Sequence, residues 1–317
     1  MKRRGALVIW VAVAAAGTAL AFALGPAGFG WPAPGSAIWI ARRDRVLAGL
    51  VVGAGLSTSG TLMQALLRNP LADPYVLGVS GGAALGAALA IVAGWMSAVA
   101  IPTAAFLGGL LTLALVYGLS APRRSEPSLY TLLLCGIIVS SISGALLMLL
   151  ITLAPTAGLR GITWWMLGSL QVPSSTLLRA AAGLNAATVV TAWAFAPGWN
   201  ALTLGTDVAH HVGLRAQRAV FFGLALATLA TAASVALAGL IGFVGLIVPH
   251  AVRLISGADH RRLIPASALA GGTLLVLCDA AARTIRTPME LPVGVITALI
   301  GGPFFIALLR RRQGWAL

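Results

Sequence analysis

Apolar stretches long enough to cross a lipid bilayer recur along this chain from Leu7 to Leu309, and only short polar breaks separate them. A helix needs about 20 mostly apolar residues to cross the hydrocarbon core, where its backbone must satisfy its own hydrogen bonds. Hydrophobic residues make up 59% of the 317 residues, charged residues make up 9%, and the mean hydropathy is +0.97. A soluble surface cannot be assembled from so few polar residues. The sequence predicts an all-α integral membrane protein with a single transmembrane domain over residues 1–317.

About ten spans are predicted, and boundary errors leave nine or eleven open. They lie near residues 5–24, 46–67, 76–94, 99–119, 130–153, 178–197, 218–239, 241–256, 263–282 and 292–310. The eighth is short, as expected for a broken or tilted helix. The first follows a basic start but is long and lacks a small-x-small cleavage site, so it is interpreted as a retained span. No convincing internal repeat is visible in the sequence.

The distribution of positive charge predicts the orientation. An even number of spans places both termini on the same side, and with the termini inside, fourteen of the 21 Lys and Arg residues face the cytoplasm. Such an excess is typical of cytoplasmic loops. The net charge of +14 is therefore interpreted as membrane anchoring, not nucleic-acid binding. The longest outer segments, at residues 25–45 and 154–177, are predicted to meet an external partner.

Several catalytic and metal sites are excluded by residue types. The single lysine, Lys2, precludes a G-x-x-x-x-G-K-[ST] loop, so the chain cannot itself be a P-loop ATPase. The four histidines form no H-E-x-x-H pattern, and no carboxylate pair has a spacing that suggests acid–base catalysis. Cys135 and Cys278 lie within apolar runs, as expected for small core residues. We expect no catalytic residue, no metal site and no cofactor bound by this chain.

Carboxylates inside the lipid region bear on the energy source of a transporter. A carrier driven by protons or ions is expected to place one there, and Asp279 is the only clear candidate. Arg283 follows one helical turn later, so the two are interpreted as a charge pair. The energy source is then expected to be a partner subunit. An ion-gradient carrier and a membrane scaffold without transport remain as alternatives.

The break after the second span reads SGTLMQALLRNPLADPYVLGVSGGAALG. Pro70 and Pro74 are expected to end a helix, and Asn69 and Asp73 suit turn and cap positions before a glycine-rich helix. Taken alone, this chemistry predicts a rigid cytoplasmic turn.

A second break, NALTLGTDVAHHVGL, covers residues 200–214. Thr206 and Asp207 are candidate caps of a short helix on the cytoplasmic side. A short helix between two spans is a natural docking surface.

Glycines recur every four residues in two predicted spans. They are Gly49 and Gly53 in the second, and Gly78, Gly82 and Gly86 in the third. This spacing allows helix backbones to approach closely in lipid, so it predicts helix packing.

Several long motifs, in order, cover nearly the whole chain. They are VGAGLSTSGTLMQALLRNPLADPYVLGVSGGAALG, LLLCGIIVSSISGALL, WWMLGSL, LTLGTDVAHHVGL, VALAGLIGFVGLIVPHAVRLI and ELPVGVITALIGGPFFIALL. Together they resemble the FecCD family of ABC importer permeases, which carry iron-siderophore complexes, haem or cobalamin. The resemblance implies a multi-pass subunit of the bacterial inner membrane, paired with a second permease, which is an identical chain or a similar one. The implied partners are two cytoplasmic ATPase subunits, which use the ATP, and a periplasmic solute-binding protein.

The resemblance also implies four groups of functional residues. The cytoplasmic gate would comprise Asn69, Leu71, Ser128, Leu129 and Tyr130. The translocation path, lined by the fifth and tenth spans, would include Ser140, Ser141 and Ser143. A coupling segment at about 200–216 would contact the ATPase through Gly205, Thr206, Asp207 and Ala209. The binding protein would dock on Arg42, Arg45 and Arg283.

One feature departs from the family pattern. Where the family commonly has Arg-Leu-Pro-Arg, this chain has Arg42, Arg43, Asp44 and Arg45. Asp44 could engage a neighbouring arginine and weaken docking.

Overall fold

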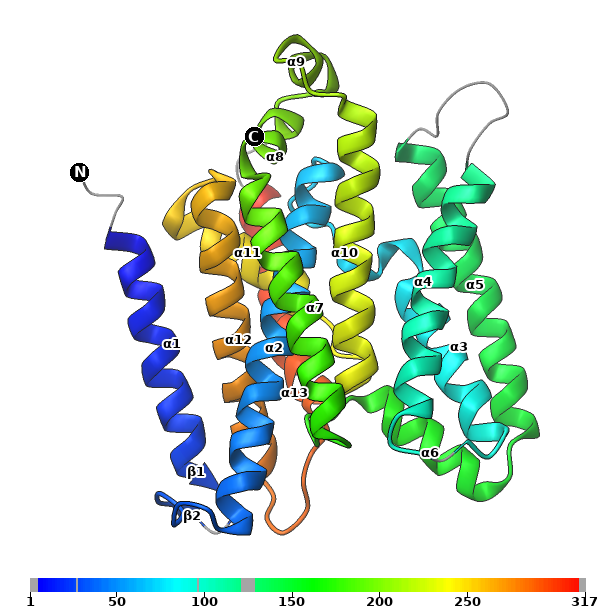
Figure 1. The fold of residues 1–317 in the computed structure, drawn as a ribbon, viewed down its shortest axis with the longest axis vertical. Helices are drawn as coiled ribbons and strands as arrows, with labels where there is room; N and C mark the ends of the chain where they lie inside the picture. The colour runs from blue at the N-terminus through cyan, green and yellow to red at the C-terminus, as the bar shows by residue number, and fades with distance from the viewer. Residues whose placement is uncertain (1–4, 27, 96, 121–128, 314–317) are drawn as a thin grey trace.

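The computed structural model describes residues 5–26, 28–95, 97–120 and 129–313, and these form a helical bundle (Figure 1). The helices are α1 (Gly5–Ala23), α2 (Ala37–Leu66), α3 (Val79–Val92), α4 (Ala100–Ser120), α5 (Leu129–Leu153), α6 (Thr156–Leu167), α7 (Ser175–Ala194), α8 (Ala196–Thr203), α9 (Thr206–His211), α10 (Ala216–Ala238), α11 (Val244–Ser256), α12 (His260–Thr284) and α13 (Val293–Gln313), with a 3-10 turn η1 (Pro74–Leu77). Strands β1 (Leu24–Gly25) and β2 (Gly28–Phe29) form a small antiparallel hairpin.

The helices confirm a multi-pass membrane protein. Within the described residues, six helices are long and apolar enough to cross a membrane: α2, α4, α5, α7, α10 and α12. Shorter apolar helices occur in α1, α3, α11 and α13. The two sets correspond one to one with the predicted spans.

Two boundaries differ from the prediction. Helix α2 begins at Ala37, nine residues before the predicted span, because the Ser36 side chain caps it by accepting a hydrogen bond from the Trp39 amide. Residues 37–45 of the segment 25–45 are thus the first turns of a helix. The segment 154–177 contains α6, which was not predicted because its 12 residues are too short for a span.

The bundle has two distinct ends. The start of α1, helix α9 and the far end of α13 lie at one end, called here the α9 end (Figure 1). The β1–β2 hairpin and α6 lie at the other, called here the hairpin end. Helix α2 runs between them at the centre and packs against α12, α10, α11 and α7.

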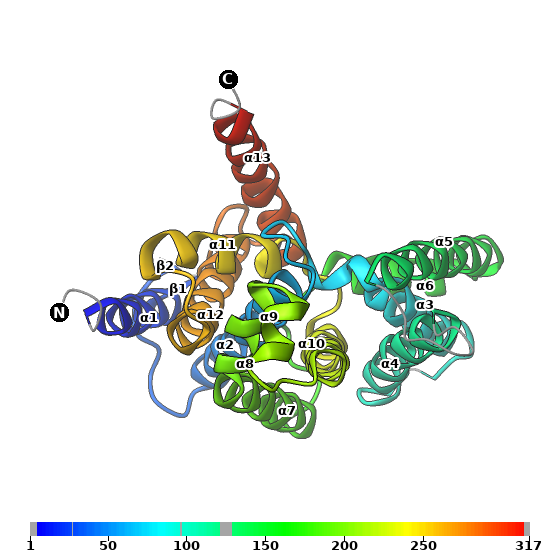
Figure 2. The ribbon, with the colours of Figure 1, turned by 90° about the horizontal axis from the view of Figure 1, so that it is seen from above.

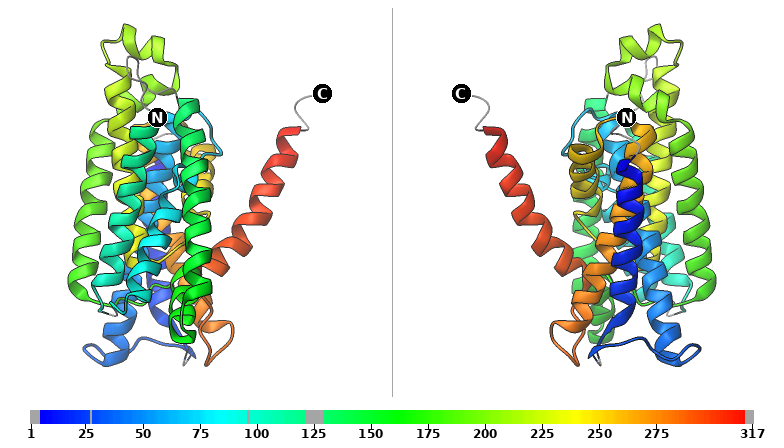
Figure 3. Two further views of the ribbon diagram at one scale, coloured as in Figure 1. Left: turned by 90° about the vertical axis from the view of Figure 1, so that its right-hand side faces the viewer. Right: turned by 90° about the vertical axis from the view of Figure 1, so that its left-hand side faces the viewer.

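Helix α13 is set apart from the rest. It contacts α12, α11 and α6 and then diverges from the bundle, while α5 extends from another side (Figures 2 and 3). Both helices therefore present apolar side chains outward, among them Ile137, Ile138, Ile142, Leu299 and Ile300.

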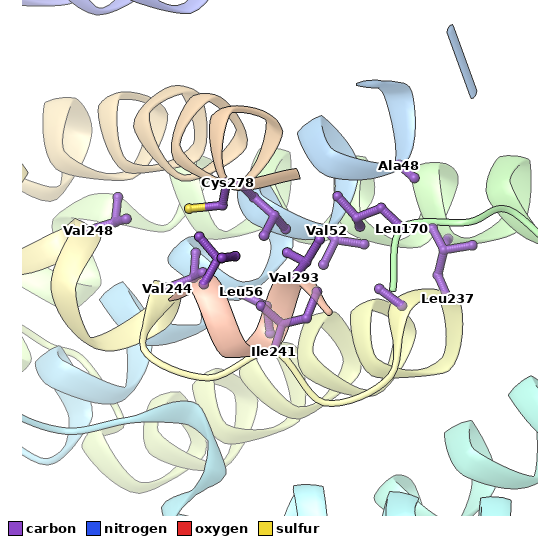
Figure 4. Packing of buried hydrophobic residues seen from close by; sticks show 14 of the residues in the cluster. Ala48, Val52, Leu56, Leu170, Leu237, Ile241, Val244, Val248, Cys278 and Val293 are labelled. Carbon is purple, nitrogen blue, oxygen red and sulfur yellow. The ribbon is translucent and has the colours of Figure 1, made fainter. Parts of the chain in front are cut away.

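A large cluster of buried apolar residues lies where α2, α10, α11 and α12 meet (Figure 4). Val52 and Leu56 of α2 pack there with Val244 of α11, and Cys278 of α12 belongs to the same cluster. The core position predicted for this cysteine is confirmed.

Glycines allow the helices to approach closely. A Cβ added to Gly53 would clash with the backbone of Gly271 in α12, and one added to Gly82 or Gly86 would clash with α4. The four-residue spacing thus marks the α2–α12 and α3–α4 contacts, as predicted. Gly60, outside that pattern, meets α11 in the same way.

Two runs of four helices each have a short second helix, although the sequence shows no convincing repeat. Helices α2 to α5 have 30, 14, 21 and 25 residues, and α10 to α13 have 23, 13, 25 and 21. The packing is reciprocal, because α2 contacts α12 and α10 contacts α4. The repetition lies in backbone arrangement, which apolar side chains can satisfy in many ways.

Candidate functional site

The turn between α2 and α3 is built by its own side chains. Asn69 Oδ1 accepts a hydrogen bond from the Leu71 amide at 2.9 Å, and Asp73 Oδ1 accepts one from the Tyr75 amide at 2.7 Å. Gly78 ends η1 at a φ of 84° and opens α3. The turn and cap roles predicted for Asn69 and Asp73 are confirmed, and both stiffen the segment.

A tyrosine joins this turn to the break between α10 and α11. Tyr75 Oη donates to the Ile241 carbonyl oxygen at 3.0 Å and lies 3.3 Å from the Ile241 amide. Just beyond, Phe243 adopts a φ of 69°, which a bulky residue rarely tolerates. The two breaks in the helical backbone are therefore held together. No motif in the sequence indicated this link.

Two of the proposed gate residues, Leu129 and Tyr130, begin α5. Leu129 packs against a buried cluster that includes Leu77 of η1 and Leu132 of α5, whereas Tyr130 is 71% exposed. Ser128 lies outside the described residues. Helix α5 crosses η1 at Gly136, where an added Cβ would lie 2.9 Å from the Val76 carbonyl oxygen.

The three serines proposed to line a path face different ways. Ser143 is buried, and a Cβ added to Gly81 of α3 would lie 3.3 Å from it. Ser140 similarly borders Gly78. Only Ser141 of these three lies on the exposed face of α5, where its hydroxyl donates to the Ile137 carbonyl.

Helix α9 lies beyond the rest of the bundle at its end (Figure 1). Gly205 precedes it at a φ of 124°, a conformation that favours glycine. Ala209 is fully buried, while Thr206 and Asp207 are exposed. The predicted capping role of Thr206 and Asp207 is wrong, because both lie within the helix and no side chain caps it.

A polar cluster attaches the helix before α9 to the start of α12. Asn200 Nδ2 donates to Asp259 Oδ1 at 2.8 Å, and Asn200 Oδ1 accepts from the His260 amide at 2.9 Å. The Asn200 hydrogen bond is the main reason that the pKa of the Asp259 carboxyl lies below its ordinary value. We call Asn200, Asp259 and His260 the α8–α12 clasp.

Two arginines at the hairpin end are buried. Arg42 is 7% exposed, and its Nη1 donates to the carbonyl oxygens of Phe22, Ala23 and Gly30 at 2.8–3.0 Å. Arg283 is 2% exposed, and its Nε lies 2.8 Å from Asp279 Oδ2. The charge pair predicted in α12 is therefore present. Both guanidinium groups are used within the chain.

Two further arginines of α2, Arg43 and Arg45, are more accessible than Arg42 and Arg283. Arg43 pairs with Asp44 at 2.8 Å and lies over the Trp39 ring, so Asp44 does engage a neighbouring arginine. Arg45 forms a bidentate pair with Glu290, and Gln171 Nε2 donates to the same carboxylate at 3.0 Å. Arg45, Gln171 and Glu290 border a cavity of about 540 Å³.

The pairing changes the acidity of the carboxylate. Hydrogen bonding from Arg45 is the main reason that the pKa of Glu290 lies below its ordinary value. Among the described residues, no three His, Cys, Asp or Glu side chains are placed to hold a metal ion.

A sequence model of the FecCD transport family matches residues 29–311. The chain belongs to the FecCD transport family. The hemin transport system permease protein of Yersinia pestis is 39% identical over 283 residues, covering 87% of this chain and 84% of the relative. The cobalamin import system permease protein of Halobacterium salinarum is 41% identical over 276 residues, covering 87% and 74%. A solved metal-chelate type ABC transporter in an inward-facing conformation superposes with a TM-score of 0.88 at 31% identity, covering 97% of this chain and 99% of that one.

In this FecCD protein the carboxylate predicted inside the membrane, Asp279, forms an ion pair with an arginine of the same helix. Asp279 and Arg283 neutralise each other in a buried pair, which accounts for both residues without ion coupling. Neither the family nor the relatives support the ion-gradient carrier.

Three residues of the FecCD chain that sequence reasoning missed shape its two ends. Glu290 and Gln171 complete the Arg45 site, and Asn200 holds the α8–α12 clasp. Glu290 immediately precedes Leu-Pro and the last span, and a carboxylate there was a detectable signal. Its partner was not, because 245 positions separate it from Arg45.

Proposed function

We propose that this chain is the permease subunit of an ATP-binding-cassette importer for a metal chelate of the haem, cobalamin or iron-siderophore class. It carries no catalytic site, and a separate ATPase subunit hydrolyses the ATP. The observation that carries the proposal is the placement of α9. This short helix is held beyond the spans at one end, while the paired Arg45 lies at the other.

The α9 end faces the cytoplasm in this proposal, as the excess of positive charge favours. Gly205, Thr206, Asp207 and Ala209 form the contact with the ATPase. Support comes from the exposure of Thr206 and Asp207 and from the buried Ala209, which fixes α9 to the bundle. The α8–α12 clasp then offers a rigid connection from this contact to a span.

The hairpin end faces the periplasm and receives the solute-binding protein. Arg45 is the docking arginine that the structure favours most, since 13% of its side chain is exposed and its fork can hold a carboxylate in a bidentate manner. Arg42 and Arg283 act mainly by shaping this end, because both are buried, Arg42 against backbone carbonyls and Arg283 against Asp279.

A second permease, an identical chain in the simplest arrangement, covers the outward faces of α5 and α13. These faces are apolar and belong to helices that extend from different sides of the bundle. The path lies between the two permeases, with Ser141 on its wall. Asn69, Leu71, Leu129 and Tyr130 form the cytoplasmic gate.

Transport then follows alternating access. Closure of the ATPase subunits moves α9, the clasp carries the motion to α12, and the two permeases rock to admit substrate from the docked binding protein. A wide path that lacks a tight polar site suits a bulky chelate.

The test is ATP-dependent uptake into proteoliposomes that hold this chain and its ATPase. Haem, cobalamin and a ferric siderophore are each delivered by the binding protein encoded beside the permease. Uptake of one of them, abolished by Asp207→Arg, is the expected result. Val212→Arg, exposed and just past α9, controls for added charge. No uptake of any of the three, with ATP hydrolysed by an intact complex, contradicts the proposed cargo class.

A further inference from the structure

We infer that Glu290 is an internal ligand of Arg45 that the binding protein displaces when it docks, and that this exchange of carboxylates releases the segment leading into α13. The inference rests on the proposed function, because it takes Arg45 as a docking residue. It adds a residue that competes with the partner for the same guanidinium group.

The geometry of the pair is that of an occupied docking site. Arg45 Nη1 lies 2.9 Å from Glu290 Oε1, and Arg45 Nη2 lies 2.5 Å from Glu290 Oε2. Both donors of this edge of the guanidinium are thus taken by one carboxylate. A carboxylate of the binding protein that sought the same bidentate geometry would have to replace Glu290.

Two cavities beside the pair provide space for such an exchange. One cavity of about 540 Å³ and another of about 270 Å³ are both lined by Arg45, Arg283 and Glu290. The ion pair therefore borders two cavities. One can admit an incoming carboxylate while the other accommodates the displaced Glu290 side chain.

The local charge favours a carboxylate as the group that replaces Glu290. Arg42, Arg45 and Arg283 lie near two carboxylates, Asp279 and Glu290, and Asp279 is held by Arg283. Displacing Glu290 leaves the partly buried guanidinium group of Arg45 without its carboxylate partner. A second carboxylate restores the pairing, whereas a neutral group does not.

The position of Glu290 links this exchange to the last helix. It lies in the stretch between the end of α12 and the start of α13 at Val293. Through Arg45 and Gln171 it ties this stretch to α2 and to the segment after α6. The next residue stays anchored, because the Leu291 amide donates to the Ala282 carbonyl at 3.0 Å. Release of Glu290 therefore frees the outer part of the stretch, including the exposed Met289, but leaves α13 attached.

The first experiment measures the affinity of the cargo-free binding protein, encoded beside the permease, for the permease–ATPase complex in nanodiscs. Glu290→Gln is nearly isosteric and removes the competing charge, so we expect binding to tighten about five-fold, the scale of one partly exposed ion pair. Arg45→Ala is expected to weaken binding at least ten-fold. Arg43→Ala removes an arginine of the same turn that pairs with Asp44, and it serves as the matched control.

The double variant Arg45→Ala/Glu290→Gln distinguishes the docking role of Arg45 from the exchange of Glu290. If Glu290 acts only through Arg45, the double variant binds as weakly as Arg45→Ala. Tightening by Glu290→Gln that persists without Arg45, or no tightening at all, overturns the exchange while leaving Arg45 as a docking residue. Unchanged binding by Arg45→Ala overturns the docking role and the exchange together.

A fluorescent probe tests the release of the segment directly. Met289→Cys, in a chain with Cys135 and Cys278 replaced by serine, is labelled with an environment-sensitive dye. We expect docking to shift its emission, and Glu290→Gln to produce the same shift without binding protein. A dye that reports no change on docking contradicts the release.

Discussion

Replacement of Gly53 by alanine tests whether close backbone contact between α2 and α12 holds the core together. The new Cβ would lie 2.5 Å from the Gly271 carbonyl carbon and 2.8 Å from the Gly272 Cα, whereas ordinary contact begins at 3.4 Å. All of these atoms are backbone, so no side chain can rotate away. The two helices have to separate by roughly an ångström, which removes contacts along the whole crossing.

The expected cost follows from two opposing terms. Overpacking of a close-packed interior costs about 1 to 3 kcal/mol or more, and the rigid backbone here places Gly53→Ala at the upper end. The better helix propensity of alanine returns at most about 1 kcal/mol. Gly183→Ala is the matched control, because Gly183 lies in α7 with nothing within 4 Å of an added Cβ. It should stabilise the protein by about 0.5 to 1 kcal/mol.

The assay follows the buried thiol of Cys278. Its side chain lies in the same core, so a thiol-reactive dye labels it only when the bundle opens, and Cys135→Ser removes the half-buried second thiol. The variants should differ by about 3 kcal/mol, which corresponds to about 6 to 12 °C in Tm on the scale of soluble domains. If Gly53→Ala melts at or above the temperature of Gly183→Ala, the packing argument is refuted.

Three further predictions address the ends of the bundle. Asn200→Ala should cost about 2 kcal/mol through lost hydrogen bonds of the α8–α12 clasp, and it should lower cargo moved per ATP; an unchanged ratio would count against the clasp as a relay. Tyr75→Phe should cost about 1 kcal/mol in the same melting assay, with no loss expected if the Ile241 contact is incidental. The pKa of Glu290 is lowered from 4.5, so its ion pair stabilises fully above that pH and is lost as pH falls through the lowered value; the Tm difference between wild type and Glu290→Gln should shrink only below pH 4.5.

Much of the architecture was predictable because lipid imposes strong constraints on sequence. An apolar run of span length has few alternatives to a helix, so ten such runs predicted the spans closely. The turn at Asn69 and Asp73 was equally predictable, since these side chains bond to amides only two residues away. Hydrogen bonds of this kind can be predicted because both partners lie within a few consecutive residues.

The capping of α9 shows where local reasoning failed. Thr206 and Asp207 are good capping residues, but Gly205 provides the turn into the helix at a positive φ, so they fall inside it. Helix α6 was missed for a related reason: a helix shorter than a span leaves no hydropathy signal that separates it from a loop.

By itself, the sequence determined the membrane class, the spans, the family and the types of residue at each end. Only the tertiary structure decided which of those residues are available. Arg42 is buried against backbone carbonyls and Arg283 against Asp279. Ser140 and Ser143 turn toward α3. Arg45 pairs with a carboxylate that lies 245 positions away in the sequence. The physical reason is that a side chain's exposure and partner depend on how distant helices cross. In a bundle of interchangeable apolar surfaces, that crossing is set by backbone contacts at small residues and by scattered polar pairs.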